Sequence, residues 1–426
     1  MKIFVKNRIA LITLSLMTLQ NCTFNEEINT DPNNPKTAPL NALLTPAEML
    51  VAYTWGGNLS RYNGMFVQQL EGFDRQAAAI YQYQFKRSDT DDPWDNLYRA
   101  LLNARDVIKL GGSTSPHYTG IAKVLTAFSL GTLTSHYGDI PYTEGVKGDI
   151  GVLQPKFDSQ QSIYLNIQTL LDEAIIELAS DNVGLAPGND DIIYKGDPSL
   201  WIVAAKALKA RYYLHTAKVD PTGYTNAIIF ANDALTSFTG FKLTFDGASA
   251  TTEAPWYQWN SQRGDIIPNS FAYDLMDTIS DPRIPKYFDL TTAGGFNGGF
   301  GTYLQSPSGP VVMMARSELY FILAEAYFAQ GDLGNAETNL ELGVQESYSE
   351  TGSSGTYNVT TVTLEEIMLQ KYFSMYLSPE VWIDWRRTGL PPITPTDNVA
   401  VPRKYPYPQK EKNYNGPNVP DEGNIP

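Results

Sequence analysis

The strongest constraint on the fold comes from two neighbouring segments, 320–327 and 336–343, in which large and small side chains recur at helical spacing. The residues that carry this pattern are Tyr320, Leu323, Ala324, Tyr327, Ala336, Leu340 and Gly343. Steps of three and four residues place them on one face of each helix, and Gly331-Asp332 predicts the turn between the two. Small residues let two helices cross closely, and large ones fill the space where the helices diverge. The two segments therefore predict a helical hairpin.

This spacing is that of the tetratricopeptide repeat. Ala227, Ala231 and Ala234 repeat its four-then-three step on a second segment, which follows a turn at residues 218–224. The two hairpins are not in tandem, because a loop-rich spacer at about 238–315 separates them. Ordinary amphipathic packing is the alternative explanation, and we favour helical-hairpin repeats over it.

Further helices are predicted from their starting residues. Capping carboxylates followed by proline, or capping boxes, are found at Asp92-Pro93, Asp158 with Gln161, Asp197-Pro198, and Thr363 with Glu366. Apolar residues at helical spacing follow each of these starts, and one more helix is expected at about 118–137. The fold is therefore expected to be mainly α-helical, with tetratricopeptide-like hairpins and an insertion that carries a few short strands.

The N-terminal segment predicts export. Basic residues precede a short apolar stretch, Ile9–Leu19, which is too short to span a bilayer permanently. Cys22 follows directly and is the only cysteine of the chain. The motif Leu19-Gln20-Asn21-Cys22 resembles a lipobox, although Gln20 and Asn21 are larger and more polar than the usual small residues of that motif. A plain secretory signal with an accidental cysteine is the alternative that we favour less.

We accordingly predict three parts of the chain. Residues 1–21 are expected to be a lipoprotein signal peptide, and Cys22 is expected to carry the lipid anchor. Residues 22–41 are rich in Asn, Asp, Pro and Thr and lack apolar periodicity, which indicates a flexible tether. Residues 42–426 are expected to form a single domain.

The charge balance limits the class of partner. Lys and Arg total 31 against 46 Asp and Glu, a formal net charge of −15. Such an acidic surface repels phosphate backbones, so we expect no nucleic acid partner. A neutral oligosaccharide or peptide would not be repelled.

Catalytic and metal-binding motifs are not found in the sequence. It contains no P-loop, no H-E-x-x-H and no G-x-S-x-G. The three histidines are scattered, and the aspartates around Trp94 lack EF-hand spacing. We therefore expect no enzyme, no metal and no cofactor. An enzyme on the same scaffold would need two carboxylates, or a nucleophile and a base, to converge in one pocket.

Aromatic residues, 12% of the chain, indicate a binding role. Sugars have apolar C–H faces ringed by hydroxyls, so a glycan site needs exposed flat rings together with amides or arginine. Rings in the irregular spacer are the better candidates, whereas rings at helical spacing are expected in the core. The candidate ligand-binding residues are Trp256, Tyr257, Trp259 and Arg263 in the spacer, and Trp94, Arg61, Tyr62, Tyr81 and Tyr83 elsewhere.

Several motifs, taken in order, resemble the SusD-like or RagB-like nutrient-binding lipoproteins of Bacteroidetes. The matching segments are Asn29–Pro35, Tyr137–Tyr142 with Glu144, Asp281–Lys286, Arg316–Glu318 leading to Ala324–Ala326, Glu380–Gly389 and Arg403–Pro408. In addition, Glu26 and Glu27 resemble the acidic patch that directs such lipoproteins to the cell surface. The resemblance runs from about residue 28 to 415, nearly the whole mature chain.

This resemblance implies a scaffold of tetratricopeptide-like units whose insertions build the ligand surface. It also implies a lipid-anchored location on the outer membrane and a partner, a SusC-like TonB-dependent barrel that imports what the lipoprotein captures. The usual ligand class is oligosaccharide, and some relatives bind peptides. A peptide-binding role, an enzyme on this scaffold and, less favoured, a scaffold for protein partners stay as alternatives.

Overall fold

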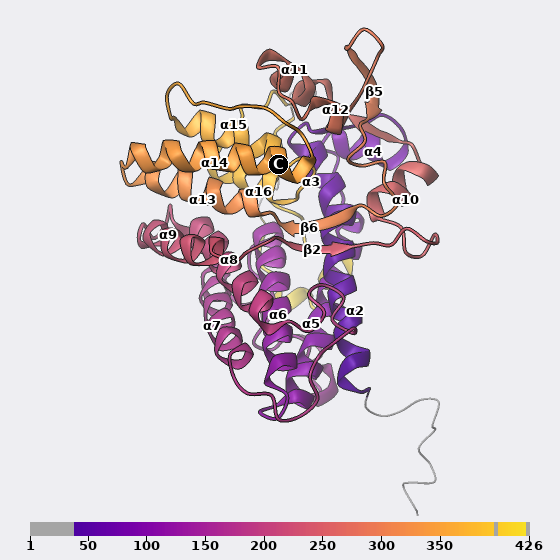
Figure 1. The fold of residues 1–426 in the computed structure, drawn as a ribbon. Coiled ribbons are helices and arrows are strands. Elements are labelled where there is room, and N and C mark those ends of the chain that lie inside the picture. The colour runs from indigo at the N-terminus through magenta and orange to yellow at the C-terminus, as the bar shows by residue number, and fades with distance from the viewer. Residues whose placement is uncertain (1–37, 396–398, 423–426) are drawn as a thin grey trace, which may run out of the picture. The chain divides into compact units, whose positions relative to one another are not determined.

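Helices dominate the computed structural model, which describes residues 38–395 and 399–422 (Figure 1). The predicted signal peptide, Cys22 and the motif Asn29–Pro35 lie outside the described residues. The first described helix begins at Leu40, and the residues from there onward form one unit. No described helix combines the length and the apolar character that a bilayer crossing requires.

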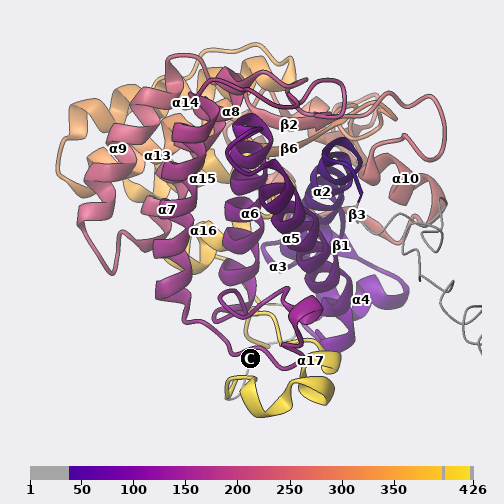
Figure 2. The ribbon, with the colours of Figure 1, turned by 90° about the horizontal axis from the view of Figure 1, so that it is seen from below.

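The scaffold is a succession of helices, each packed against the next. Its members are α2 (Leu40–Thr54), α5 (Asp91–Gly111), α6 (Pro116–Tyr137), α7 (Gln160–Leu178), α8 (Pro198–Thr216), α9 (Thr222–Leu235), α13 (Arg316–Ala329), α14 (Leu333–Thr351) and α15 (Leu364–Ser374). Helix α5 packs against α2 and α6, α7 packs between α6 and α8, and α13 packs against α9 and α14 (Figure 2). This arrangement confirms the predicted mainly α-helical fold.

The hairpin signatures mark two of these helix pairs. Helices α13 and α14 lie side by side, as α8 and α9 do (Figure 1). A Cβ atom at Gly343 on α14 would lie 3.2 Å from the Cβ of Tyr320 on α13, so the close crossing favours a small residue. Ala227, Ala231 and Ala234 are fully buried on α9. Both hairpin predictions are confirmed.

Most predicted helix starts are found within two residues. Asp197 and Thr363 cap α8 and α15 with their side chains. Helix α5 begins at Asp91, so Asp92 lies inside its first turn and is not the cap. The prediction that Asp158 caps α7 was wrong: Ser159 is the cap, because the Asp158 carboxylate instead accepts hydrogen bonds of 2.8 Å from the backbone of Tyr142 and Thr143.

The spacer between the hairpins contains short strands and short helices. Its elements are β2 (Phe241–Thr244), α10 (Pro255–Gln262), β3 (Ile266–Pro268), α11 (Ser270–Thr278), α12 (Ile284–Tyr287), β4 (Phe288–Leu290), β5 (Phe296–Phe300) and β6 (Pro310–Met314). Strand β2, predicted from its alternation, pairs antiparallel with β6, and β4 pairs with β5. Strand β3 pairs with β1 (Leu70–Gly72). Because β1 follows α3 (Ser60–Phe66), this ladder holds α3 beside the spacer.

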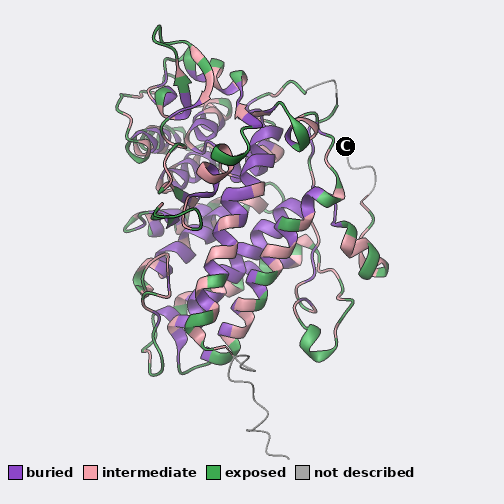
Figure 3. Ribbon diagram, turned by 90° about the vertical axis from the view of Figure 1, so that its right-hand side faces the viewer, coloured by how far each residue is buried: buried purple, intermediate pink, exposed green. Residues whose placement is uncertain are grey.

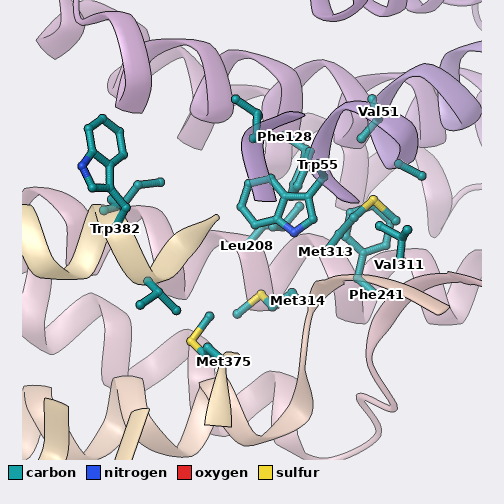
Figure 4. Packing of buried hydrophobic residues seen from close by; sticks show 14 of the residues in the cluster. Val51, Trp55, Phe128, Leu208, Phe241, Val311, Met313, Met314, Met375 and Trp382 are labelled. Atoms are coloured by element: carbon teal, nitrogen blue, oxygen red, sulfur yellow. The ribbon is translucent and has the colours of Figure 1, made fainter. Parts of the chain in front are cut away.

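The core joins the spacer to the scaffold. Buried residues line the inner faces of the helices (Figure 3). Trp55, at the end of α2, meets Phe128 of α6 with ring centroids 5.0 Å apart, and Phe128 meets Phe241 of β2 at 5.5 Å (Figure 4). Strand β2 is therefore part of the hydrophobic core, and the spacer that follows it is held against the helices.

The C-terminal part of the chain packs against the helical scaffold. Helix α16 (Glu380–Thr388) packs against α3 and α15, and α17 (Gln409–Tyr414) is the last α-helix described. On α16, Arg387 forms ion pairs of 2.6 Å with Glu325 and Asp384, and the Trp382 ring is fully buried. The segment 380–389 is thus a structural element of the core.

Candidate ligand-binding site

Three segments that are distant in the sequence meet at one pocket of about 270 Å³. They are the helical break between α2 and α3, the first turns of α5, and α10. The lining residues are Tyr53, Thr54, Gly57, Asn58, Arg61, Asp92, Pro93, Asn96, Pro255, Gln258, Trp259 and Gln262. The break is a π-helical segment, Trp55–Leu59, kinked at Gly57 (φ −98°, ψ −118°).

Trp259 contributes an indole ring to the lining of this pocket. It lies on α10, whose first residue, Pro255, has the fixed φ angle that favours a helix start. Its indole is half-buried, and two guanidinium groups lie against the ring, with the Cζ of Arg61 3.8 Å and that of Arg263 4.7 Å from its centroid. Such cation–π contacts are attractive and fix the orientation of the ring.

Arg61 and Arg263 differ in their surroundings. Arg263 is partly exposed and forms an ion pair of 2.8 Å with Asp265. Arg61 is only 6% exposed, and its Nη2 donates a hydrogen bond to Oδ1 of Asn58. Burial, the largest effect, lowers the pKa of Arg61 to about 10, so its guanidinium is still charged at neutral pH.

Polar groups surround the indole. Side-chain amides come from Asn58, Asn96, Gln258 and Gln262, and Asp92 contributes a carboxylate. Amides offer both donors and an acceptor. Oδ1 of Asn58 already accepts from Arg61, and Nε2 of Gln258 donates to the carbonyl of Ala250. The remaining groups suit a ligand that is rich in hydroxyl groups. A flat ring with amides around it can bind such a ligand without any covalent chemistry.

Trp256, a predicted ligand residue, lies elsewhere. The expectation that it sits in an irregular loop was wrong, because it is on α10 and only 9% of its surface is exposed. Its Nε1 donates a hydrogen bond of 2.9 Å to Oγ of Ser60. It lines a separate cavity of about 270 Å³ beside β6 and α15. Tyr257, the next residue, is half-buried and is not part of the lining of the Trp259 pocket.

The other predicted tyrosines are not part of the lining of the Trp259 pocket. Tyr62 meets Phe85 edge-on at 5.5 Å between centroids, and Tyr83 lies against Phe66 at 6.3 Å. The hydroxyl of Tyr81 accepts a hydrogen bond of 2.8 Å from Asn269. Tyr62 and Tyr83 are buried, so their faces are not available for stacking in this arrangement.

Trp94 belongs to a different part of the molecule. It is 3% exposed and its ring centroid lies 4.8 Å from that of Tyr98 and 4.9 Å from that of Tyr137. Its edge lines a third cavity of about 780 Å³ with Arg99 and Arg105. The structure therefore brings together only three of the predicted residues, Arg61, Trp259 and Arg263.

The amides of the pocket were not predicted from the sequence. Asn58, Asn96 and Gln258 come from three separate segments, and amides on helices are usually read as solvent-facing positions. For Asp92 the sequence suggests a helix cap, and the aspartate cluster to which it belongs lacks the spacing of a calcium site. One signal in the sequence could have indicated the pocket. The glycine pair Gly56-Gly57 lies inside an apolar helical stretch, and glycines at such a position indicate a break in the helix that serves packing or function.

Comparisons with known proteins agree with the observed fold. A family profile described as starch-binding and associating with the outer membrane matches residues 32–408. A SusD/RagB family protein from Bacteroides thetaiotaomicron has 22% identity and a TM-score of 0.72, covering 90% of this chain and 95% of that chain. A chitin-binding SusD homologue from Flavobacterium johnsoniae has 20% identity and a TM-score of 0.74, covering 89% and 94%. None of the curated proteins matches the chain.

The family match spans most of the chain, and the solved structures share its helical architecture over nearly their whole length. The resemblance noted in the sequence motifs is thereby confirmed. The chain belongs to the SusD-like family of starch-binding proteins that associate with the outer membrane.

Proposed function

We propose that this protein is a lipid-anchored, non-catalytic binding protein that captures oligosaccharides at the cell surface and passes them to a TonB-dependent transporter. The observation that carries the proposal is the half-buried indole of Trp259, held by two guanidinium groups in a pocket lined by amides. The family description as starch-binding supports a carbohydrate ligand.

The pocket suits part of an oligosaccharide. Its volume of about 270 Å³ is close to the lower end of the range for small-molecule sites, about 300–1,000 Å³. One sugar unit would bind Asn58, Asn96 and Gln258 through its hydroxyls. Its C–H face would stack on Trp259 in place of the guanidinium of Arg263, the exposed one of the two that lie against the ring. The remaining units would extend out of the pocket over the surface. This mode needs no rearrangement of the core.

Two further features support the location and the partner. The family associates with the outer membrane, and Cys22 stands at the end of an export signal in a motif that resembles a lipobox. The resemblance to SusD-like lipoproteins implies a SusC-like TonB-dependent barrel in the same membrane, and this is the partner that we propose.

Peptides are the second candidate ligand class. Trp256 is buried, so the pocket has fewer exposed rings than the sequence predicts. Fewer rings weaken sugar stacking, while the amides around the pocket would bind peptide backbones equally well. This observation favours a peptide ligand, although Trp259 and the family description favour a glycan.

A binding screen distinguishes oligosaccharide ligands from peptide ligands. The soluble chain, starting after Cys22, is applied to arrays of oligosaccharides and of peptides, together with a Trp259→Ala variant. Saturable binding to one oligosaccharide class, lost in the variant while its circular dichroism spectrum is unchanged, supports the proposal. Binding to peptides alone would replace it with the second candidate.

A further inference from the structure

We propose that the oligosaccharide held at the Trp259 pocket is acidic, with a carboxylate or sulfate group that faces Arg61. This inference rests on the proposed function, because it assigns the ligand class of the same pocket. It starts from the charge of Arg61, which the fold buries with no carboxylate within 4.0 Å among the described residues; Asp265, the carboxylate that acts on it from further away, is paired with Arg263.

Arg61 differs from three other buried arginines in its ion pairing. Arg211, Arg283 and Arg387 each lie 2.6 Å from a carboxylate oxygen. Arg61 has no carboxylate within 4.0 Å among the described residues; its one hydrogen bond there goes to the amide of Asn58, and its Nε has no partner. These three guanidinium groups in the core thus have a carboxylate partner, whereas the one at the pocket has none within 4.0 Å.

Arg386 provides an internal comparison. It also lacks a carboxylate partner among the described residues, but its guanidinium donates to the backbone carbonyls of Arg403 and Ser135. It lines none of the three pockets that contain the candidate residues. The Nε of Arg386 has no hydrogen-bond partner either. Arg61 differs in that it makes a single side-chain hydrogen bond, to Asn58, and lines a pocket that a ligand can enter.

A buried charge without a counterion is costly, and burial accordingly lowers the pKa of Arg61 to about 10. The contacts with Trp259 and Asn58 offset only part of this cost. An anionic group in the pocket would supply the missing charge. Guanidinium groups bind carboxylates and similar oxyanions with short, charge-assisted hydrogen bonds.

Asp92 opposes an anion in the same pocket, and so does the net charge of −15 over the longer range that salt screens. Its carboxylate is exposed and therefore well screened by water, whereas Arg61 acts from a buried position, where charge interactions are stronger. Arg61 should dominate for an anionic group placed next to it. Removing the charge of Asp92 should then strengthen binding of the acidic ligand, which gives a test that leaves the core untouched.

The test uses matched pairs of oligosaccharides that differ in charge. One pair is oligogalacturonate and its methyl ester, and the other is sulfated and unsulfated dextran oligosaccharide; a glutamate-rich peptide is added. Dissociation constants are measured for the chain after Cys22 and for its Arg61→Gln, Asp92→Asn and Trp259→Ala variants. We expect one acidic saccharide to bind at least about tenfold more tightly than its neutral counterpart, as a charge-assisted hydrogen bond requires.

Arg61→Gln should bring this ratio of affinities close to one, and Asp92→Asn should raise it several-fold. The inference is overturned if the neutral saccharides bind equally well, or if the preference survives Arg61→Gln. Binding of both members of a pair without a charge preference, lost in Trp259→Ala, would overturn this inference and leave the proposed function standing. Binding of the peptide alone, or of no probe, would overturn both.

Discussion

Arg211 on α8 and Glu318 on α13 form a two-fold ion pair, with both of its hydrogen bonds 2.6 Å long, in which both side chains are almost completely buried. A second carboxylate, that of Glu380 on α16, lies 3.8 Å from Arg211 and 2.5 Å from Nε2 of His215. This network joins one hairpin to the other across the core. It fixes the scaffold against which the spacer and its pocket are held.

Breaking this ion pair should destabilise the fold strongly. Glu318→Gln keeps the shape of the side chain but removes its charge, so Arg211 loses its closest counterion. We expect a loss of about 3–5 kcal/mol in the free energy of unfolding, measured by urea denaturation. The matched control is Glu346→Gln, which removes a partly exposed partner of Arg316 and should cost at most about 1 kcal/mol. Equal effects of the two substitutions would contradict this role.

Asp384 makes the free energy of unfolding depend on pH in the acidic range. Burial alone would raise the pKa of Asp384, but Lys371 and Arg387 outweigh it and lower the pKa to about 2, below the usual 3.8. A lowered pKa stabilises the folded state above the unfolded value, and this stabilisation, about 2 kcal/mol, is lost as the pH falls from about 4 to 2. Unfolding free energies measured over this range should fall more steeply for the wild type than for Asp384→Asn. Parallel curves would refute the assignment.

Gly131 marks a close approach between α6 and α8. A Cβ atom at this position would lie 2.3 Å from the ring of Tyr212, so Gly131→Ala should destabilise the protein by about 1–3 kcal/mol through overpacking. Gly334, on the exposed first turn of α14, has no atom within 4 Å of the same position. Gly334→Ala should therefore be neutral or slightly stabilising. Thermal unfolding of the two variants compares them, and a Gly131→Ala variant as stable as the wild type would disprove the close packing.

Cys22 is expected to carry the lipid anchor. In a Bacteroidetes host, the Cys22→Ala variant should lose the incorporation of labelled palmitate and move from the membrane fraction to a soluble one, because no other residue can receive the thioether-linked lipid. The amount of folded protein should not change, since Cys22 precedes Leu40, the first residue of the helical unit, in the sequence. Retention of the label by the variant would exclude this anchor.

Local signals explain most of what could be predicted from the sequence. Asp197 and Thr363 mark helix starts because a cap acts on residues two or three positions away. Asp158 failed as a cap because the backbone of Tyr142 and Thr143, distant in sequence, binds its carboxylate. The adjacent Ser159, equally suited to capping, takes that place instead.

The site was harder to predict because it depends on long-range contacts. Trp256 and Trp259 are three residues apart on one helix, and nothing local separates them. Ser60 accepts a hydrogen bond from Trp256 in the core, whereas Arg61, the next residue, stacks on Trp259 at the pocket. The pairing of β1 with β3 and the contact of α10 with the helical break place the two indoles, and neither contact can be predicted from the local sequence.

The central claim is that Trp259 forms the sugar-binding surface, and the affinity of two neighbouring variants tests it most directly. Titration calorimetry with an oligosaccharide found by the array should show a loss of about 1–2 kcal/mol or more for Trp259→Ala, because the stacking surface is removed. Tyr257→Ala, a matched control on the same helix outside the pocket lining, should bind like the wild type. If Trp259→Ala keeps the wild-type affinity while the protein is folded, the ligand binds elsewhere and the account of this site is wrong.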